Sequence, residues 1–183
     1  MQLLPRILIG CLAPFALLGA FQGAMAADSS VEYGVKGAFL YKLIPFVQWP
    51  TSALPSPNAP IAICILGHDP FGAALDKQVA DQHADAHPIV LRRIDAPDPS
   101  CQAVFVGNAD APTETAMLQA YQGKPVLTVT DSGAPAGGIV SFVIDNNHVR
   151  FDIDDAAAAR SGLTISSKLL SLARNTKPRG GAL

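Results

Sequence analysis

The chain has 183 residues, of which 49% are hydrophobic and 15% are charged, and its formal net charge at pH 7 is -2. A near-neutral chain without a block of like charge has no electrostatic footprint for nucleic acid or for an anionic membrane, so we expect neither as a partner. The length suits one compact domain, expected over residues 27–174, and residues 175–183 are predicted to form a flexible tail.

The first 26 residues have the features of a secretory signal peptide. Arg6 precedes an apolar stretch over residues 7–21, and the small-residue motif AMA follows at 24–26. This order predicts secretion with cleavage after Ala26. The stretch is shorter than the roughly 20 residues that cross a bilayer, so a retained membrane anchor is the less favoured alternative. A lipoprotein attachment site at Cys11 is a weaker alternative, because the apolar stretch continues well beyond it.

Two cysteines, Cys64 and Cys101, follow the expected signal peptide. An even number of cysteines in an oxidising compartment favours a disulfide bond. Such a bond would stabilise the fold by roughly 3–4 kcal/mol by restricting the unfolded chain. Two buried free thiols are the alternative.

Residues 30–47 are predicted to form a helix. Apolar residues recur there at spacings of three and four, which is typical of a helix with one buried face. The residues expected on that face are Val31, Val35, Phe39, Leu43 and Phe46. Proline lacks an amide donor and clashes with the preceding turn, so Pro45 is expected to kink the helix near Ile44 or to start a new turn. The proline-rich segment 51–60 is predicted to be a loop.

Four short runs rich in isoleucine and valine follow, and such runs are typical of strands buried on both faces of a sheet. They are IAICILG (61–67), HPIVLRRI (87–94), AVFVG (103–107) and KPVLTVTD (124–131). Helical patterns lie between the first and second runs and between the third and fourth, which predicts a parallel α/β sheet. A bond between Cys64 in the first strand and Cys101 before the third requires adjacent strands, and the strand order 2-1-3-4 satisfies this.

The C-terminal third predicts a different arrangement. Two alternating runs around Asn146 and Asn147, within residues 138–154, predict a β-hairpin. Residues 154–175 predict two short helices joined at Gly162. The expected fold is therefore a three-layer, Rossmann-like α/β domain with a mostly parallel sheet, a C-terminal hairpin and terminal helices.

Motifs for chemistry are few. The sequence has no G-x-S-x-G motif, and its glycine-rich segment 131–138 follows a strand without opening a helix, so we expect no catalytic site, cofactor or metal. Ligands of α/β proteins usually bind beyond the carboxyl ends of the strands. His68 follows the first strand, and Asp131 and Ser132 follow the fourth, so these three are candidate ligand-binding residues. Turn formation is the alternative role.

Five segments resemble, in order, blocks of the YfiR family of periplasmic proteins. They are VKGAFLYKLIPFVQWP, IAICILGHDPFGAALD, CQAVFVG, GKPVLTVTDSGAPAGGIVSFVIDNNHVRFDID and AAAARSGLTISSKLLSLAR. The resemblance implies a non-enzymatic periplasmic repressor that binds the sensor domain of an inner-membrane diguanylate cyclase and lowers cyclic-di-GMP and biofilm formation. It also implies sequestration by an OmpA-like outer-membrane lipoprotein, and a homodimer. A periplasmic small-molecule sensor or solute-binding module is the alternative.

The resemblance also bears on the cysteines. Cys64 and Cys101 match the disulfide placement of the family. Some relatives have a second pair near the hairpin, whereas this sequence has no cysteine after Cys101. Redox control through a second bridge is therefore not implied here.

Two apolar segments supply candidate residues for a partner or dimer surface. Segment 39–50 is expected to be mostly core, with Tyr41 and Trp49 available to a partner because aromatic residues are enriched at interfaces. Segment 162–174 has more apolar surface at helical spacing than one core contact needs. The residues expected to contribute are Leu163, Ile165, Leu169 and Leu172. The alternative is that all four belong to the core.

Overall fold

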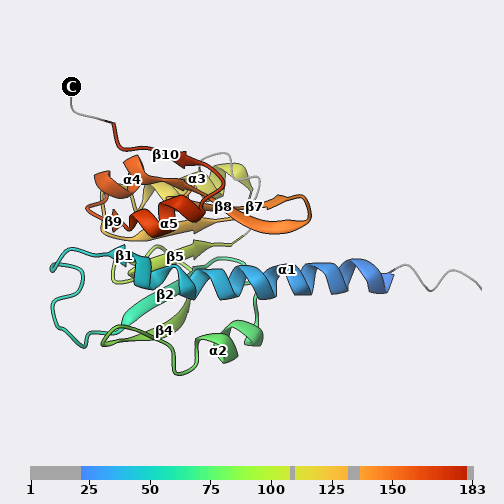
Figure 1. Cartoon of the computed structure of the whole chain (residues 1–183). Coiled ribbons are helices and arrows are strands. Elements are labelled where there is room, and N and C mark those ends of the chain that lie inside the picture. Colours follow the sequence, from blue (N-terminus) through green and yellow to red (C-terminus); the bar gives the residue numbers. More distant parts are fainter. Residues whose placement is uncertain (1–21, 108–109, 132–136, 181–183) are drawn as a thin grey trace, which may run out of the picture.

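A mixed eight-stranded sheet forms the centre of the computed structural model, which describes residues 22–107, 110–131 and 137–180 (Figure 1). Within these residues the strand order is β10-β8-β7-β6-β5-β2-β4-β3. The strands are β2 (Ile61–Leu66), β3 (His83–Ala84), β4 (His87–Ile94), β5 (Ala103–Val106), β6 (Leu127–Thr130), β7 (Val140–Asp145), β8 (His148–Asp154) and β10 (Thr176–Lys177).

The centre of the sheet is parallel. β2 lies between β4 and β5, and β6 lies beside β5, so the predicted strand order 2-1-3-4 is confirmed. All six residues of β2 are buried, as expected for a strand covered on both faces. The predicted hairpin is also confirmed, because β7 and β8 pair antiparallel around Asn146 and Asn147, both with positive φ.

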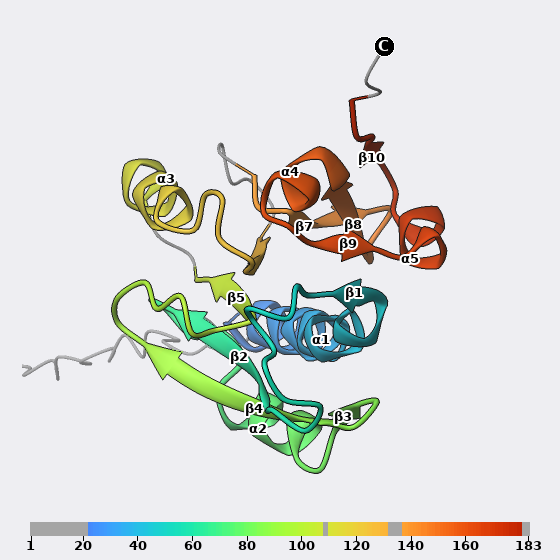
Figure 2. The same cartoon turned by 90° about the vertical axis from the view of Figure 1, so that its left-hand side faces the viewer.

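Helices cover both faces of the sheet. They are α1 (Gln22–Lys42), the 3-10 helix η1 (Ile44–Phe46), α2 (Ala73–Val79), α3 (Ala111–Gln119), α4 (Asp155–Arg160) and α5 (Ser167–Leu172). α1, α2 and α5 lie on one face, and α3 and α4 lie on the other (Figure 2). The predicted three-layer α/β fold is therefore confirmed.

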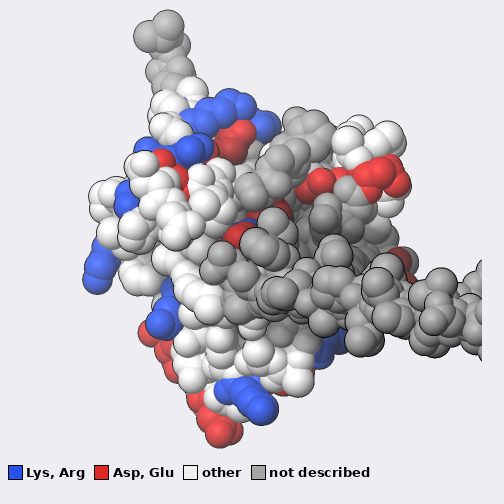
Figure 3. All heavy atoms as spheres, turned by 90° about the vertical axis from the view of Figure 1, so that its right-hand side faces the viewer, with Lys and Arg blue, Asp and Glu red and all other residues white. Residues whose placement is uncertain are grey.

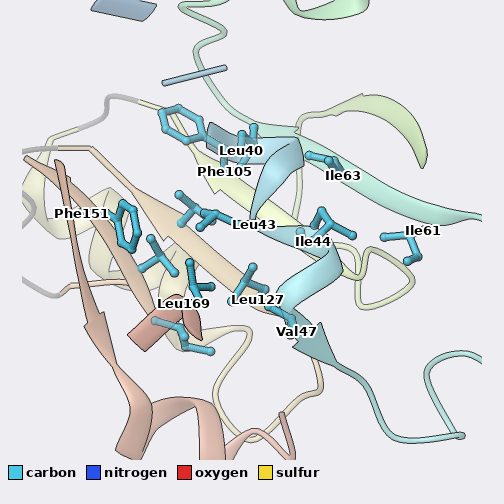
Figure 4. Packing of buried hydrophobic residues seen from close by; sticks show 14 of the residues in the cluster. Leu40, Leu43, Ile44, Val47, Ile61, Ile63, Phe105, Leu127, Phe151 and Leu169 are labelled. Carbon is cyan, nitrogen blue, oxygen red and sulfur yellow. The ribbon is translucent and has the colours of Figure 1, made fainter. Parts of the chain in front are cut away.

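The larger part of the hydrophobic core lies under α1. Leu40 of α1 and Leu43, which directly follows α1, pack with Leu169 of α5 against Phe105 and Leu127 of the sheet (Figure 4). A smaller cluster on the α3 face contains the disulfide bond between Cys64 and Cys101, whose Cα atoms are 6.0 Å apart. The structure thus contains the predicted bridge, and it lies between adjacent strands.

The buried face of α1 differs from the predicted one. Val31 and Val35 are 69% and 40% exposed, whereas the buried residues include Lys36 and Leu40. The reason is geometric: at 3.6 residues per turn, positions four apart rotate by about 40° with each step, so a long series leaves the core face. The expectation for Pro45 is confirmed, since α1 ends at Lys42 and the proline lies in the separate turn η1.

Two short pairings were not predicted. β1 (Val47–Gln48) pairs antiparallel with β9 (Thr164–Ile165), which ties the end of η1 to the linker between α4 and α5. β10 pairs parallel with β8 inside the segment predicted as a flexible tail. The described part of that segment is held by charge, because Arg179 donates to Asp155 at 2.8 Å. Ion pairs between residues distant in sequence produce no local pattern, so the sequence did not predict these contacts of residues 175–180.

Candidate functional site

A buried cluster of charged residues joins α1 to the carboxyl end of β6, the edge of the sheet where α/β proteins usually bind ligands. Asp131 directly follows β6, and Lys36 of α1 is fully buried above it. The Lys36 Nζ donates to Asp131 Oδ1 at 2.5 Å and to the carboxylate of Glu32, one helical turn earlier. The lysine is thus held between two carboxylates contributed by different elements.

Tyr33 completes this cluster. Its hydroxyl donates to Asp131 Oδ2 at 2.7 Å, and its ring centroid lies 4.7 Å from Lys36 Nζ, a distance suited to a cation–π contact. Burial, reinforced by the hydrogen bond to Asp131, raises the pKa of Tyr33 well above its usual value, so the phenol remains a donor at neutral pH. The ring also packs edge-on against Phe71, with centroids 5.7 Å apart.

A third carboxyl group lies nearby on α3. Glu114 is buried, and burial raises its pKa, with a smaller contribution from the charge of Asp131. In the part of the chain that the structure describes, no group of three histidine, cysteine or acidic side chains is arranged to hold a metal ion. The hydrogen bonds of Lys36 and Tyr33 to Asp131 orient α1 on the sheet, and Lys36 is already engaged as a donor.

The predicted ligand-binding residues reach the same edge but differ in availability. His68 is exposed and lines a hollow of about 360 Å³ together with Tyr33 and Phe71. Asp131 is connected to this hollow through Tyr33, yet its carboxylate accepts hydrogen bonds from Tyr33 and Lys36. Ser132 lies outside the described residues. A ligand at this edge would contact His68 first and would have to displace internal partners to reach Asp131.

Most of the predicted partner-binding residues are buried within the chain itself. Leu163, Ile165 and Leu169 belong to the core under α1, so the expectation that they form a partner surface is corrected. The β1–β9 pairing places Ile165 opposite Val47 and turns its side chain inward. Leu172 differs, since it is 55% exposed at the end of α5.

The two aromatic candidates are partly buried. Tyr41 packs against the core under α1 and contacts Lys42, whose Nζ lies 5.9 Å from the ring centroid. Trp49 also packs against that core, and its Nε1 donates to the carbonyl oxygen of Gln102 at 3.0 Å. Neither ring is fully exposed to solvent, and the indole N–H of Trp49 already donates a hydrogen bond within the chain.

An exposed apolar surface beside the hairpin was missed by sequence reasoning. Val31 and Val35 lie two turns and one turn before Phe39, which packs edge-on against Phe151 of β8. The hairpin extends alongside this part of α1 (Figure 1), and its Ile144 is also exposed. We call Val31, Val35 and Ile144 the α1–hairpin face. The signal in the sequence was the series of apolar residues four apart in the helix. This series indicates an apolar stripe, but it does not show which of its residues contact the core and which are exposed.

Among the described residues that are visible in the space-filling view of this end, lysine and arginine side chains do not gather in one large patch (Figure 3). This agrees with a net charge of -2 and supports an apolar rather than an electrostatic contact.

A comparison with models of protein families shows the family of this chain. A family model described as YfiR/HmsC-like matches residues 33–174 of the 183. The chain belongs to the YfiR/HmsC-like family. This family is periplasmic, regulatory and non-catalytic, and it acts in cyclic-di-GMP signalling.

The matched region starts inside α1 and ends just after α5, so it includes the disulfide and most of the buried cluster around Lys36. No helix among the described residues is both long enough and apolar enough to span a bilayer.

Proposed function

We propose that this protein is a periplasmic negative regulator that binds and inhibits the sensor domain of a membrane-bound diguanylate cyclase, lowering cyclic-di-GMP and biofilm formation. The match of residues 33–174 to the YfiR/HmsC-like family carries this proposal. In this proposal residues 1–26 are a cleaved signal peptide, residues 27–174 form the working domain, and the protein is not an enzyme.

The site geometry supports binding rather than catalysis. Lys36 and Tyr33 both donate to Asp131, so their polar groups are engaged within the chain rather than offered to a substrate. Exposed apolar residues occur instead on the α1–hairpin face, and such patches on a soluble domain mark interaction sites. We assign this face, together with Leu172, to the contact with the cyclase sensor domain.

Deletion and recovery experiments test the proposal. Loss of the gene should raise cyclic-di-GMP and biofilm mass, and the tagged protein should recover a diguanylate cyclase from detergent-solubilised membranes. The Val35→Asp variant should neither lower cyclic-di-GMP nor recover the cyclase, while its melting temperature should stay nearly unchanged. Val90→Asp is the matched control, because Val90 is 37% exposed, close to the 40% of Val35, and lies on β4 at the other end of the sheet. Recovery of no signalling protein by the unmodified chain would refute the proposal.

Two further partners belong to the same proposal. An OmpA-like outer-membrane lipoprotein would compete with the cyclase for the regulator, and a homodimer would be the resting form. Competition is measured by adding the purified lipoprotein domain to the cyclase complex, and dimerisation by sedimentation. A lipoprotein that binds without releasing the cyclase would contradict sequestration.

A small-molecule sensor is the second candidate, favoured by the hollow beside His68. A ligand at a hundredfold excess over its dissociation constant should add about 2.7 kcal/mol of stability, visible as a thermal shift. The shift should disappear in His68→Ala, while Val35→Asp should retain it. This pair of variants separates a ligand function from binding of the cyclase.

A further inference from the structure

A groove lies between α3 and α4, on the face of the sheet opposite α1. Thr128 of β6 and Ile139, which directly precedes β7, line this groove. β6 and β7 are parallel neighbours, with Val129 opposite Val140.

The groove is of a size for small molecules. Its volume is about 550 Å³, within the range of roughly 300–1,000 Å³ typical of ligand pockets. Leu118 of α3, Ile139 before β7 and Ala157 of α4 line it with apolar surface. This lining can cover the apolar body of a ligand and exclude water from it.

Two buried hydroxyl groups face the groove with donors available. The Oγ1 of Thr128 accepts a hydrogen bond from the Ile139 amide at 2.9 Å, which leaves the Thr128 hydroxyl proton unused by that contact. Ser161, which directly follows α4, also lines the groove, and its hydroxyl can donate a hydrogen bond. These hydroxyl groups suit a ligand that supplies acceptor oxygens.

The charge at the rim favours an anion. Lys177 of β10 and Arg160 of α4 line the groove with one acidic side chain, Asp154, which gives a net charge of 2 − 1 = +1. Lys177 Nζ is bound to Asp154 Oδ2 at 2.9 Å, whereas among the described residues Arg160 interacts with Asp154 only through its charge, without a hydrogen bond. A guanidinium group matches a carboxylate with two parallel hydrogen bonds, so Arg160 is the natural anchor.

We infer that this groove binds a small organic carboxylate, with its apolar body on Leu118, Ile139 and Ala157 and its carboxylate toward Arg160. The site is separate from the α1–hairpin face, so it would add a ligand input to the protein, independent of the proposed cyclase contact.

Benzoate is the probe, because it combines a flat apolar body with one carboxylate. Amide NMR shifts of the intact secreted protein should saturate below about 10 mM benzoate, with the largest changes near Thr128 and Ser161. Benzyl alcohol has the ring without the charge, and inorganic phosphate has the charge without the ring. Both should bind at least tenfold more weakly than benzoate.

Two pairs of variants identify the groove. Arg160→Gln should weaken benzoate binding about tenfold, whereas Arg150→Gln, at an exposed arginine on the hairpin, should not. Ala157→Leu should block the groove without changing charge, whereas Ala159→Leu on the exposed side of α4 should not. Absence of saturation, equal binding of benzyl alcohol or phosphate, or unchanged affinity in both Arg160→Gln and Ala157→Leu would each overturn the inference. Thermal melts confirm that each variant is folded.

Discussion

Lys36 of α1 donates a 2.5 Å hydrogen bond to Asp131, 95 residues later in the chain, and the ammonium group is fully buried. A buried charge pair holds only when its geometry is good, because both groups have left water. Here Tyr33 and Glu32 supply the additional contacts. The pair therefore fixes the position of α1, and with it the α1–hairpin face, relative to the sheet.

Removing the lysine should be strongly destabilising. Lys36→Met leaves the largely buried carboxylate of Asp131 without its cation, while Glu32 is 33% exposed and can be hydrated, so the cost should be at most roughly 3–5 kcal/mol in the free energy of unfolding. Urea denaturation measures this directly. Lys42→Met is the matched control on the same helix, since Lys42 is exposed, and it should change stability by less than about 0.5 kcal/mol. Equal effects of the two substitutions would show that the buried pair does not anchor α1.

Glu114 should make the protein less stable as pH rises. Burial raises its pKa in the folded state, so the folded protein retains this proton at a pH where the unfolded chain has released it. The stabilising contribution is complete below the ordinary value of 4.5 and is lost as pH increases through the folded pKa. Glu114→Gln should therefore raise the free energy of unfolding at pH 7 and change it little near pH 4. Denaturation curves at both pH values test this, and a variant that is less stable at pH 7 would contradict it.

Much of the sheet could be predicted from the sequence, because its strands are continuous runs of isoleucine and valine with turn residues between them. The two cysteines added a long-range constraint that selected the strand order, and the structure has Cys64 and Cys101 in bonding distance across β2 and the start of β5. The hairpin was predictable because Asn146 and Asn147 tolerate the positive φ that a tight turn requires.

The buried cluster could not be predicted in the same way. Lys36 lies one turn before Leu40 on the core face, which is a position where a sequence pattern expects an apolar residue. Its partner Asp131 comes from another element, and no local spacing connects them. β9 was missed for a similar reason, because two residues such as Thr164 and Ile165 pair only when β1 is already in place.

The disulfide should be present in the secreted protein. Cys64 and Cys101 are both buried, and the bridge closes a sequence separation of 37, so it should contribute about 3–4 kcal/mol in the chain-entropy model. Denatured but unreduced protein should react with no thiol reagent. The double variant Cys64→Ser with Cys101→Ser should lower the urea midpoint accordingly. Two reactive thiols per mature chain would contradict the bond.

Leu169 and Leu172 lie on the same short helix and should respond differently to aspartate. Leu169 is buried in the core under α1, so Leu169→Asp buries a carboxylate without a partner, and a loss of several kcal/mol should unfold the domain. Leu172 is 55% exposed, so Leu172→Asp should leave the melting temperature nearly unchanged.

Recovery of the cyclase from membranes tests whether Leu172 belongs to the partner surface. If Leu172 belongs to the partner surface, as we propose, Leu172→Asp should fold and yet recover less cyclase from membranes than the unmodified chain. Ser171→Asp is the matched control, since Ser171 is an exposed neighbour on α5 and receives the same charge. A similar loss in both variants would indicate a general effect of charge on α5. Full recovery by Leu172→Asp, together with loss in Val35→Asp, would restrict the partner surface to α1 and the hairpin.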